Sequence, residues 1–354
     1  MLWERVEDST LFQAFEWNHA AWQWCRESSE LYTLVFRKSD CIVAIIPLVK
    51  EIQNKYGMKL NVIRELSVPD NQSYDALVLK KYRSDVARTL TDNLLKKNNA
   101  YDVLELKKLT SSSFFLSNIL PIINHSPYYN HRQINTGLVP LINLDNSWDA
   151  YYSKLSRRLK KGNNLIRNKL KRTYASIEIK WFNSESCSHE DMAEAVKNYI
   201  AISSSSWKTK TGTSLNNPGP NRFIETLSSY SYERKWLSIW LLYLDGKVVA
   251  GEYQIICKRQ IYALRSDFIK GYESSSPGTF LNWKMLERIF EEKYITYEMG
   301  PGRNSYKDRW ADRYDERATL IVYSRSLKGH LLALFERSII PYIKNMRDKI
   351  RSIA

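Results

Sequence analysis

The chain has 354 residues, of which 44% are hydrophobic and 13% aromatic; this is enough for two domains with real cores and excludes a disordered chain. Its longest apolar run, Cys41 to Val49, has the length of a buried strand and is far short of a membrane span. The formal net charge of +15 indicates an anionic partner, namely a nucleotide cofactor, tRNA, an anionic lipid surface or an acidic glycan.

The first half of the chain predicts helices and strands in alternation. Leu11 to Cys25 is helix-like and aromatic, and Tyr82 to Asn98 places apolar residues on one helical face. Leu31 to Phe36 and Cys41 to Val49 are typical of a hairpin that closes near Lys38-Ser39-Asp40. The other predicted elements are a strand over 61–68, a strand over 102–106, a short helix from 111 that Pro121 interrupts, and an extended segment over 128–144.

The second half predicts a similar series. A basic helix over 148–173 comes first, followed by a strand over 176–182 and helices over 189–203 and 221–229. Between these two helices, Asn216 to Pro220 predicts a long loop that could cover a cleft.

The stretch from Trp236 to Trp310 is the most informative part of the chain. It predicts three strands, then a Ser-Pro-Gly-Thr turn that opens a helix, then a short strand over 294–297 that ends in a glycine-rich loop. Asp245-Gly246 between two apolar runs is the strongest short hairpin signal available.

Both halves therefore have the order helix, antiparallel strands, helix, strand. We infer two similar α/β domains in tandem, over residues 1–147 and 148–326, with an amphipathic helical tail over 327–354. The tail predicts either a docked helix or attachment to an anionic membrane surface.

Several motifs carry a resemblance to a known family. They are Leu244-Asp245-Gly246 with Val249-Ala250, Asp267-Phe268, Ser276 to Thr279, Glu298 to Gly302 and Tyr306-Lys307, preceded by Tyr152 to Arg172 and Asp102 to Leu106. In this order they resemble the GNAT acyltransferase superfamily. Within it the chain is similar to the acetyltransferases of cellulose and exopolysaccharide biosynthesis, which are similar in turn to the Fem peptidoglycan aminoacyltransferases.

The resemblance implies a fold and a location for the site. The fold would be α/β (α+β), with two tandem GNAT-like domains, each a mixed and mostly antiparallel sheet flanked by helices. The first domain would be degenerate, and the second would hold the donor site.

The turn before the predicted helix in the second domain is the candidate donor site. A proline at a helix start, among small residues, leaves backbone N–H groups free for a phosphate. The usual GNAT loop has a basic residue and two glycines separated by one residue, whereas here only Gly271 and Gly278 remain, so an ordinary capped helix stays an alternative. The candidate cofactor-binding residues are Ser275, Ser276, Pro277, Gly278 and Thr279.

Acyl transfer requires that donor and acceptor are aligned, that the acceptor proton leaves and that the oxyanion is stabilised. Glu298 and Asp267, each at the end of a predicted strand, are candidate bases or orienting groups. A strand-terminal acid bonded to backbone is the alternative for each.

Lys307 is the third candidate catalytic residue. In Fem-like relatives the matching lysine lies at the substrate, so the resemblance implies that Lys307 neutralises developing charge or holds a phosphate. A surface basic cluster is the alternative. Gly300, Gly302 and Tyr306 beside it are candidate substrate-binding residues.

The basic helix has no acid between Ala150 and Ile177, whereas an ordinary solvated face mixes signs. It predicts an anion-binding surface, with Arg157 and Arg158 as candidate substrate-binding residues. Trp207, just before the predicted long loop, is another.

These features predict an acyltransferase that uses a coenzyme A or carrier thioester and acts on an amine or hydroxyl of a cell-envelope or exopolysaccharide precursor, or a related metabolite. A Fem-like transferase that uses aminoacyl-tRNA and a catalytically inactive binding module remain as alternatives. The 4 cysteines and 5 histidines are scattered, and no signal peptide is evident, so we expect no disulfide framework, no metal and a cytoplasmic location, with contact at the inner face of the membrane left open.

Overall fold

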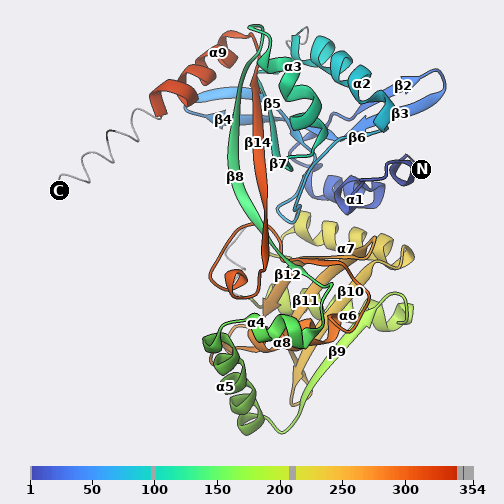
Figure 1. The fold of residues 1–354 in the computed structure, drawn as a ribbon, viewed down its shortest axis with the longest axis vertical. Helices are drawn as coiled ribbons and strands as arrows, with labels where there is room; N and C mark the ends of the chain where they lie inside the picture. Colours follow the sequence, from blue (N-terminus) through green and yellow to red (C-terminus); the bar gives the residue numbers. More distant parts are fainter. Residues whose placement is uncertain (1, 97–100, 207–212, 341–345, 347–354) are drawn as a thin grey trace.

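The computed structural model describes residues 2–96, 101–206, 213–340 and 346. Two lobes are joined by two long strands (Figure 1). The first half contains α1 (Phe15–Cys25), β1 (Glu30–Leu31), β2 (Leu34–Lys38), β3 (Cys41–Ile46), β4 (Leu48–Lys55), β5 (Met58–Glu65), β6 (Leu77–Val78), α2 (Arg83–Leu90), β7 (Val103–Leu109), α3 (Leu120–Asn124) and β8 (Asn130–Asn143).

The second half contains α4 (Trp148–Lys154), α5 (Arg157–Thr173), β9 (Ile177–Asn183), α6 (His189–Ser204), α7 (Pro218–Glu233), β10 (Leu237–Leu244), β11 (Lys247–Cys257), β12 (Gln260–Phe268), α8 (Pro277–Ile289), β13 (Thr296–Glu298), β14 (Arg313–Tyr323) and α9 (Leu327–Leu334).

The described strands form an 11-stranded sheet in the order β1-β4-β5-β7-β14-β8-β13-β12-β11-β10-β9 and a 3-stranded sheet in the order β2-β3-β6. The two halves of the large sheet repeat one motif. In the first half β4 and β5 are antiparallel, α2 follows, and β7 runs parallel to β5. In the second half β11 and β12 are antiparallel, α8 follows, and β13 runs parallel to β12. The prediction of two similar α/β units in tandem is confirmed.

The two units exchange strands. β8 follows β7 in the chain but its end pairs with β13, whereas β14 follows β13 but pairs with β7. β8 and β14 also pair with each other along their length, and these are the long strands between the lobes (Figure 1). Each unit therefore contains a strand from the other half, and the boundaries after residues 147 and 326 stay a prediction.

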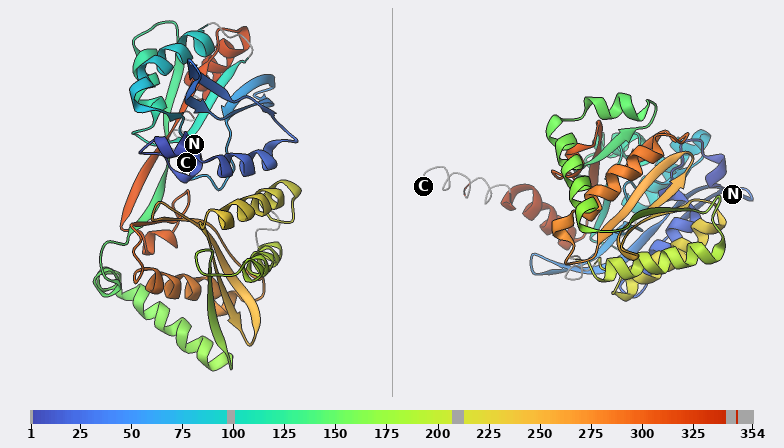
Figure 2. Two further views of the ribbon diagram at one scale, coloured as in Figure 1. Left: turned by 90° about the vertical axis from the view of Figure 1, so that its right-hand side faces the viewer. Right: turned by 90° about the horizontal axis from the view of Figure 1, so that it is seen from below.

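Helices cover both faces of the second unit's sheet. α6 and α7 pack on one face, and α8 with the basic helix α5 covers the other. The first half adds α1 to the α7 side, where Trp17 meets Phe223 edge to face with ring centroids 5.3 Å apart. Figures 1 and 2 show α1 against α7 at the junction of the lobes. This shared core fixes the two units against each other.

Three local predictions are wrong. The helix over 148–173 is two helices, because the chain turns at Ser156, whose side chain caps α5 by accepting from the Leu159 N–H at 3.2 Å. α5 then continues through Gly162 to Asn164. The predicted loop at Asn216 to Pro220 includes the first turn of α7, where proline is tolerated. The strand over Cys41 to Val49 is divided into β3 and β4 at Pro47.

The predicted tail is only partly described. α9 is followed by a π-helical turn over Phe335–Ile339, and most of the rest lies outside the described residues. Among the residues that the structure covers, none of the helices combines the length and the apolar character needed to cross a bilayer.

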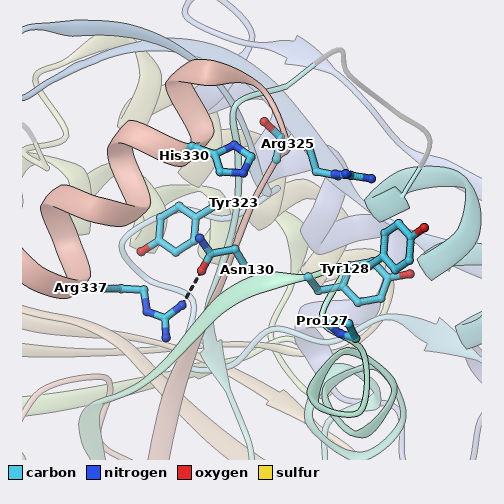
Figure 3. Close-up of a pocket in the computed structure, with 9 residues that line it drawn as sticks. Pro127, Tyr128, Asn130, Tyr323, Arg325, His330 and Arg337 are labelled. Carbon is cyan, nitrogen blue, oxygen red and sulfur yellow. Dashed lines mark hydrogen bonds between the residues drawn. The ribbon is translucent and has the colours of Figure 1, made fainter.

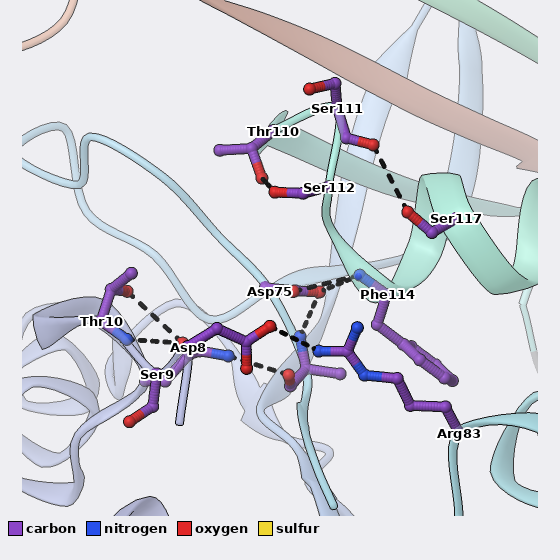
Figure 4. Close-up of polar contacts among 12 residues, drawn as sticks. Asp8, Ser9, Thr10, Asp75, Arg83, Thr110, Ser111, Ser112, Phe114 and Ser117 are labelled. Atoms are coloured by element: carbon purple, nitrogen blue, oxygen red, sulfur yellow. Dashed lines mark hydrogen bonds and ion pairs between the residues drawn. The ribbon is translucent and has the colours of Figure 1, made fainter. Parts of the chain in front are cut away.

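In the first unit, the space between the ends of the parallel strands β5 and β7 is filled. The loop after β5 turns back to β7, where its Tyr74 forms a parallel bridge with Leu109. Tyr74 is only 2% exposed and its hydroxyl donates to the Pro47 carbonyl at 2.9 Å. The adjacent Asp75 accepts from the N–H groups of Ala76 and Phe114 (Figure 4). The first unit therefore has no open cleft at this position within its described residues.

Candidate active site

The second unit has a cavity of about 600 Å³ where the first unit is filled. β12 and β13 pair in parallel over three residues only, Gln260–Tyr262 with Thr296–Glu298, and beyond these residues the two segments separate. Residues from Ala263 onward line one side of the cavity, and Met299 to Pro301 line the other. In open α/β sheets, ligands bind at the carboxyl ends of strands, where strands diverge in this way.

The predicted donor turn opens into this cavity. Ser276 has the left-handed backbone conformation, with φ of 49°, and Pro277 begins α8. Both line the cavity, as do Gly278 and Thr279. The N–H groups of Gly278 and Thr279 are in the first turn and have no acceptor within the helix. A methyl group at Gly278 would meet only the Phe268 ring, at 3.6 Å. The turn therefore offers two amides and open space to a ligand.

A buried carboxylate that the sequence analysis did not select lies in the cavity wall. Glu252, on β11, is 2% exposed. It accepts a hydrogen bond from the Tyr297 hydroxyl and one from Gln254 Nε2 at 3.0 Å. Burial, and then the charge of Glu252, raises the pKa of Tyr297 well above its usual value. Tyr297 thus stays a neutral hydrogen-bond donor to the Glu252 carboxylate. The signal in the sequence was an acid in the middle of an apolar strand.

Asp267 does not line the cavity. It accepts from the Tyr199 hydroxyl of α6 at 2.9 Å, so it lies on the opposite face of the sheet from α8. The cause is an irregularity in the β11–β12 register, where Tyr253 pairs with Arg265 but Gln254 pairs with Ala263. The extra residue, Leu264, shifts the alternation of side chains. The Asp267 side chain therefore points to the face of the sheet that α6 covers.

Glu298 also faces away from the cavity. Its neighbour Tyr297 lines the cavity, and successive side chains of a strand point to opposite faces. Burial raises the pKa of Glu298 to about 7, against the opposing effect of Arg317. The expectation that Glu298 or Asp267 would line the cleft is therefore wrong, and their catalytic roles remain untested.

Lys307 lines the cavity and holds the glycine-rich loop. Its ammonium donates to the carbonyls of Gly300 and Pro301, both at 2.9 Å, and of Gly302 at 3.2 Å. Gly300, with φ of 82°, approaches β12 so closely that a methyl group would lie 3.2 Å from the Ala263 carbonyl oxygen. Lys307 therefore fixes the loop that forms one wall.

The first unit contributes to the cavity. Arg265 of β12 donates to Asp70, in the loop after β5, at 2.7 Å and to the Thr213 carbonyl at 2.8 Å. Gln72, from the same loop, donates to the Ala263 carbonyl at 3.1 Å. The loop that fills the first unit's cleft thus builds a wall of the second unit's cavity.

The basic helix reaches the donor turn at one end only. Lys169, near the C-terminus of α5, donates to the Ser274 carbonyl at 2.7 Å. Arg157 and Arg158 are exposed at the other end, on the order of 15–20 Å away along the helix at 1.5 Å per residue.

Of the remaining predicted site residues, some line the cavity and others do not. Tyr306, Gly300 and the turn from Ser276 to Thr279 line the cavity, whereas Ser275 lies behind it with its hydroxyl 3.1 Å from that of Tyr174. Gly302 is exposed in the loop, and Trp207 lies outside the described residues. Asn282 of α8 was not predicted. It lines the cavity, is 2% exposed, and its side-chain nitrogen has no hydrogen-bond acceptor in the described part of the chain.

Comparison with known proteins agrees with this architecture. Residues 161–308 match the family described as "Acetyltransferase (GNAT) domain". A search of curated proteins found no match. The match lies within the second unit and is to a GNAT-type acetyltransferase domain, a transferase class.

Solved structures share the fold of the whole chain. The crystal structure of FemX superposes with a TM-score of 0.58 at 11% identity, covering 95% of this chain and 96% of that one. The C-terminal domain of a candidate lysylphosphatidylglycerol synthetase from Agrobacterium fabrum has a TM-score of 0.56 at 12% identity, covering 94% and 96%. L-PGS from Bacillus licheniformis has a TM-score of 0.50 at 11% identity, covering 92% and 96%. At these identities the likeness is one of fold.

Proposed function

We propose that this protein is an acyltransferase whose reaction takes place in the cavity between β12 and β13. The observation that carries the proposal is the meeting of the α8 amides and the buried Glu252 in one cavity. The donor would be a coenzyme A or carrier thioester, with a phosphate near Gly278 and Thr279 and its chain against the apolar residues Leu264, Phe268 and Met299.

The residues of the cavity supply the steps of acyl transfer. The acceptor nitrogen or oxygen attacks the thioester carbonyl, and its proton passes to Glu252. The C–S bond then breaks, and the departing thiolate takes this proton from Glu252 to leave as the thiol. Tyr297 and Gln254 hold the Glu252 carboxylate in place. The free N–H of the buried Asn282 side chain is a donor for the carbonyl oxygen as it becomes negative.

The acceptor class rests on the family resemblance. We propose an amine or hydroxyl of a cell-envelope or exopolysaccharide precursor. A thioester is already reactive toward amines, so alignment in this cavity can supply much of the rate, up to about 7–11 kcal/mol of the barrier.

A second candidate donor is aminoacyl-tRNA. Two observations favour it. Glu273 lines the cavity beside the donor turn, where its carboxylate would repel a pyrophosphate. The basic helix α5 is held against the same turn by Lys169, and its exposed cations would suit a polyanion.

The test offers both donors to the purified chain. Acetyl-CoA with glucosamine is followed by thiol release, and aminoacyl-tRNA is followed by loss of the aminoacyl ester. Glu252→Gln should lower the rate with the true donor by about 10²–10⁴-fold. Asp267→Asn and Glu298→Gln are matched controls, because these acids face away from the cavity, and should keep most of the rate. If the unmodified protein consumes neither donor, the proposal fails; if Glu252→Gln is fully active, Glu252 is not the base.

A further inference from the structure

A second pocket lies at the far end of the long strands, in the first lobe. It has a volume of about 490 Å³ and is bounded by the start of β8, the end of β14 and the helix α9 with the turn after it. Figure 3 shows His330 and Arg337 on one side of this pocket and Arg325 on the other. It is separate from the acyl-transfer cavity, with which it shares no lining residue.

The charge of this pocket is positive. Of the nine described residues that line it, two are arginines, one is a histidine and none is an acid. Arg337 is oriented by Asn130, to which it donates at 2.6 Å, and Arg325 lies over the Tyr128 ring, 5.2 Å from its centroid. Neither arginine has an ion pair among the described residues. Guanidinium groups that line one pocket in this way can bind phosphate.

The acid next to Arg337 in the chain is engaged elsewhere. Glu336, on the turn that carries Arg337, is 4% exposed. It forms a 2.5 Å ion pair with Lys55 and accepts from the Tyr323 hydroxyl at 2.7 Å. Its charge is therefore already compensated, and the two arginines face solvent.

The helix beside this pocket exposes an apolar stripe. Leu327, Leu331 and Leu334 are 78%, 39% and 52% exposed. They are spaced by four and three residues and so share one helical face, whereas Leu332 packs into a small core with β5 and β14. Figures 1 and 2 show α9 at the outer margin of the molecule.

The stripe and the pocket are contiguous. His330 precedes Leu331 on α9 and lines the pocket, and Arg337 comes one helical turn beyond Leu334. An apolar helix face next to a cationic pocket matches the boundary between acyl chains and phosphate groups at a bilayer surface. A soluble phosphate compound would use the pocket but would leave the leucines without a partner.

We propose that this face docks on an anionic membrane surface. The three leucines of α9 enter the acyl boundary, and Arg325 and Arg337 bind the phosphate of a lipid headgroup. Docking here would leave the acyl-transfer cavity, in the other lobe, open to its substrates. The proposal rests on α9 and its pocket alone and is independent of the proposed reaction.

The experiment is sedimentation of the full chain with vesicles. Wild-type protein should bind vesicles that contain phosphatidylglycerol and bind phosphatidylcholine vesicles at least 10-fold more weakly. Arg325→Gln with Arg337→Gln should weaken binding by about 30-fold, since each cation near an anionic surface contributes about a factor of five. Leu327→Gln with Leu331→Gln and Leu334→Gln should weaken binding at least as much. All five side chains are exposed, so the melting temperature should stay constant.

Matched controls separate docking from general charge. Arg157→Gln with Arg158→Gln removes the same charge from α5, and Leu165→Gln changes another exposed leucine, which is 60% exposed. Both should bind vesicles within twofold of wild type. Equal losses in the controls would overturn the proposal.

Two further results would also contradict it. Sedimentation velocity would show a second copy as the occupant if the leucine variant changed the oligomeric state without changing vesicle binding. A soluble phosphate compound would be indicated as the ligand by two results together. Millimolar inorganic phosphate would compete with vesicle binding, and the wild-type protein would bind neutral vesicles as well as anionic ones.

Discussion

Arg265 and Asp70 form a buried ion pair at 2.7 Å that joins β12 of the second unit to the loop after β5 of the first. Their side chains are 5% and 9% exposed. The contact lies in the wall of the cavity, so the position of this wall depends on both halves of the chain. Removing one member of a buried pair leaves an uncompensated charge.

Asp70→Asn should therefore be strongly destabilising. We expect the free energy of unfolding in urea to fall by about 3–5 kcal/mol. Asp8→Asn is the matched control, because Asp8 pairs with Arg83 at 2.8 Å but is 66% exposed, and it should cost less than about 1 kcal/mol. Equal effects of the two substitutions would show that the Arg265 pair is not special.

Lys307→Met should act on the reaction more than on the fold. The variant keeps most of the side-chain length but loses the donors to Gly300, Pro301 and Gly302, so the loop beside the cavity is no longer fixed. We expect kcat to fall by about 10²-fold while donor affinity changes less. Arg309→Met, an exposed cation two residues on, should leave kcat unchanged. A Lys307 variant with wild-type kcat and KM would remove this residue from the site.

Substitutions at Gly278 test the donor turn by size. Gly278→Ala should be tolerated, because the added methyl group would meet only Phe268 at an ordinary contact distance of 3.6 Å. Gly278→Trp should fill the cavity beside Thr279 and abolish turnover, with the melting temperature changed by only a few degrees. Steady-state kinetics and thermal melting of both variants check this. An active tryptophan variant would place the donor elsewhere.

Glu298→Gln should stabilise the protein at alkaline pH. Burial raises the pKa of Glu298 to about 7 from an ordinary value of 4.5, so ionisation is less favourable in the folded state. Wild-type stability should therefore decrease as pH rises from about 4.5 to 7, and glutamine removes this loss. The melting temperature of the variant should exceed that of wild type by a few degrees at pH 8 and equal it at pH 4. Glu316→Gln, at an exposed position of β14, is the control. A difference that does not vary with pH would contradict the role of burial.

Features that depend on near neighbours in the chain were predictable from the sequence. The Asp245-Gly246 turn closes the β10–β11 hairpin with φ of 48° and 74°, and the turn before α8 lies where its proline and small residues indicated. Turn residues, caps and apolar periodicity act over a few residues, so they also gave the order of elements and the tandem α/β repeat.

The position of the buried Glu252 in the cavity wall could not be predicted in this way. Asp267 and Glu298 both lie at strand ends, as expected. The extra residue at Leu264 and the alternation of side chains point them away from the cavity, whereas Glu252 lines it. A register shift depends on how two strands pair, which the pattern of either strand alone does not contain.

The sequence by itself determined the elements, their repeat and the turn at the start of α8, because these follow from local backbone preferences and apolar spacing. The tertiary structure alone decided that β8 and β14 exchange between units, that Asp70 reaches Arg265 across 195 residues of chain, and that Tyr74 fills one cleft while the other stays open. These contacts join residues far apart in the sequence, and only packing the two units against each other brings them together.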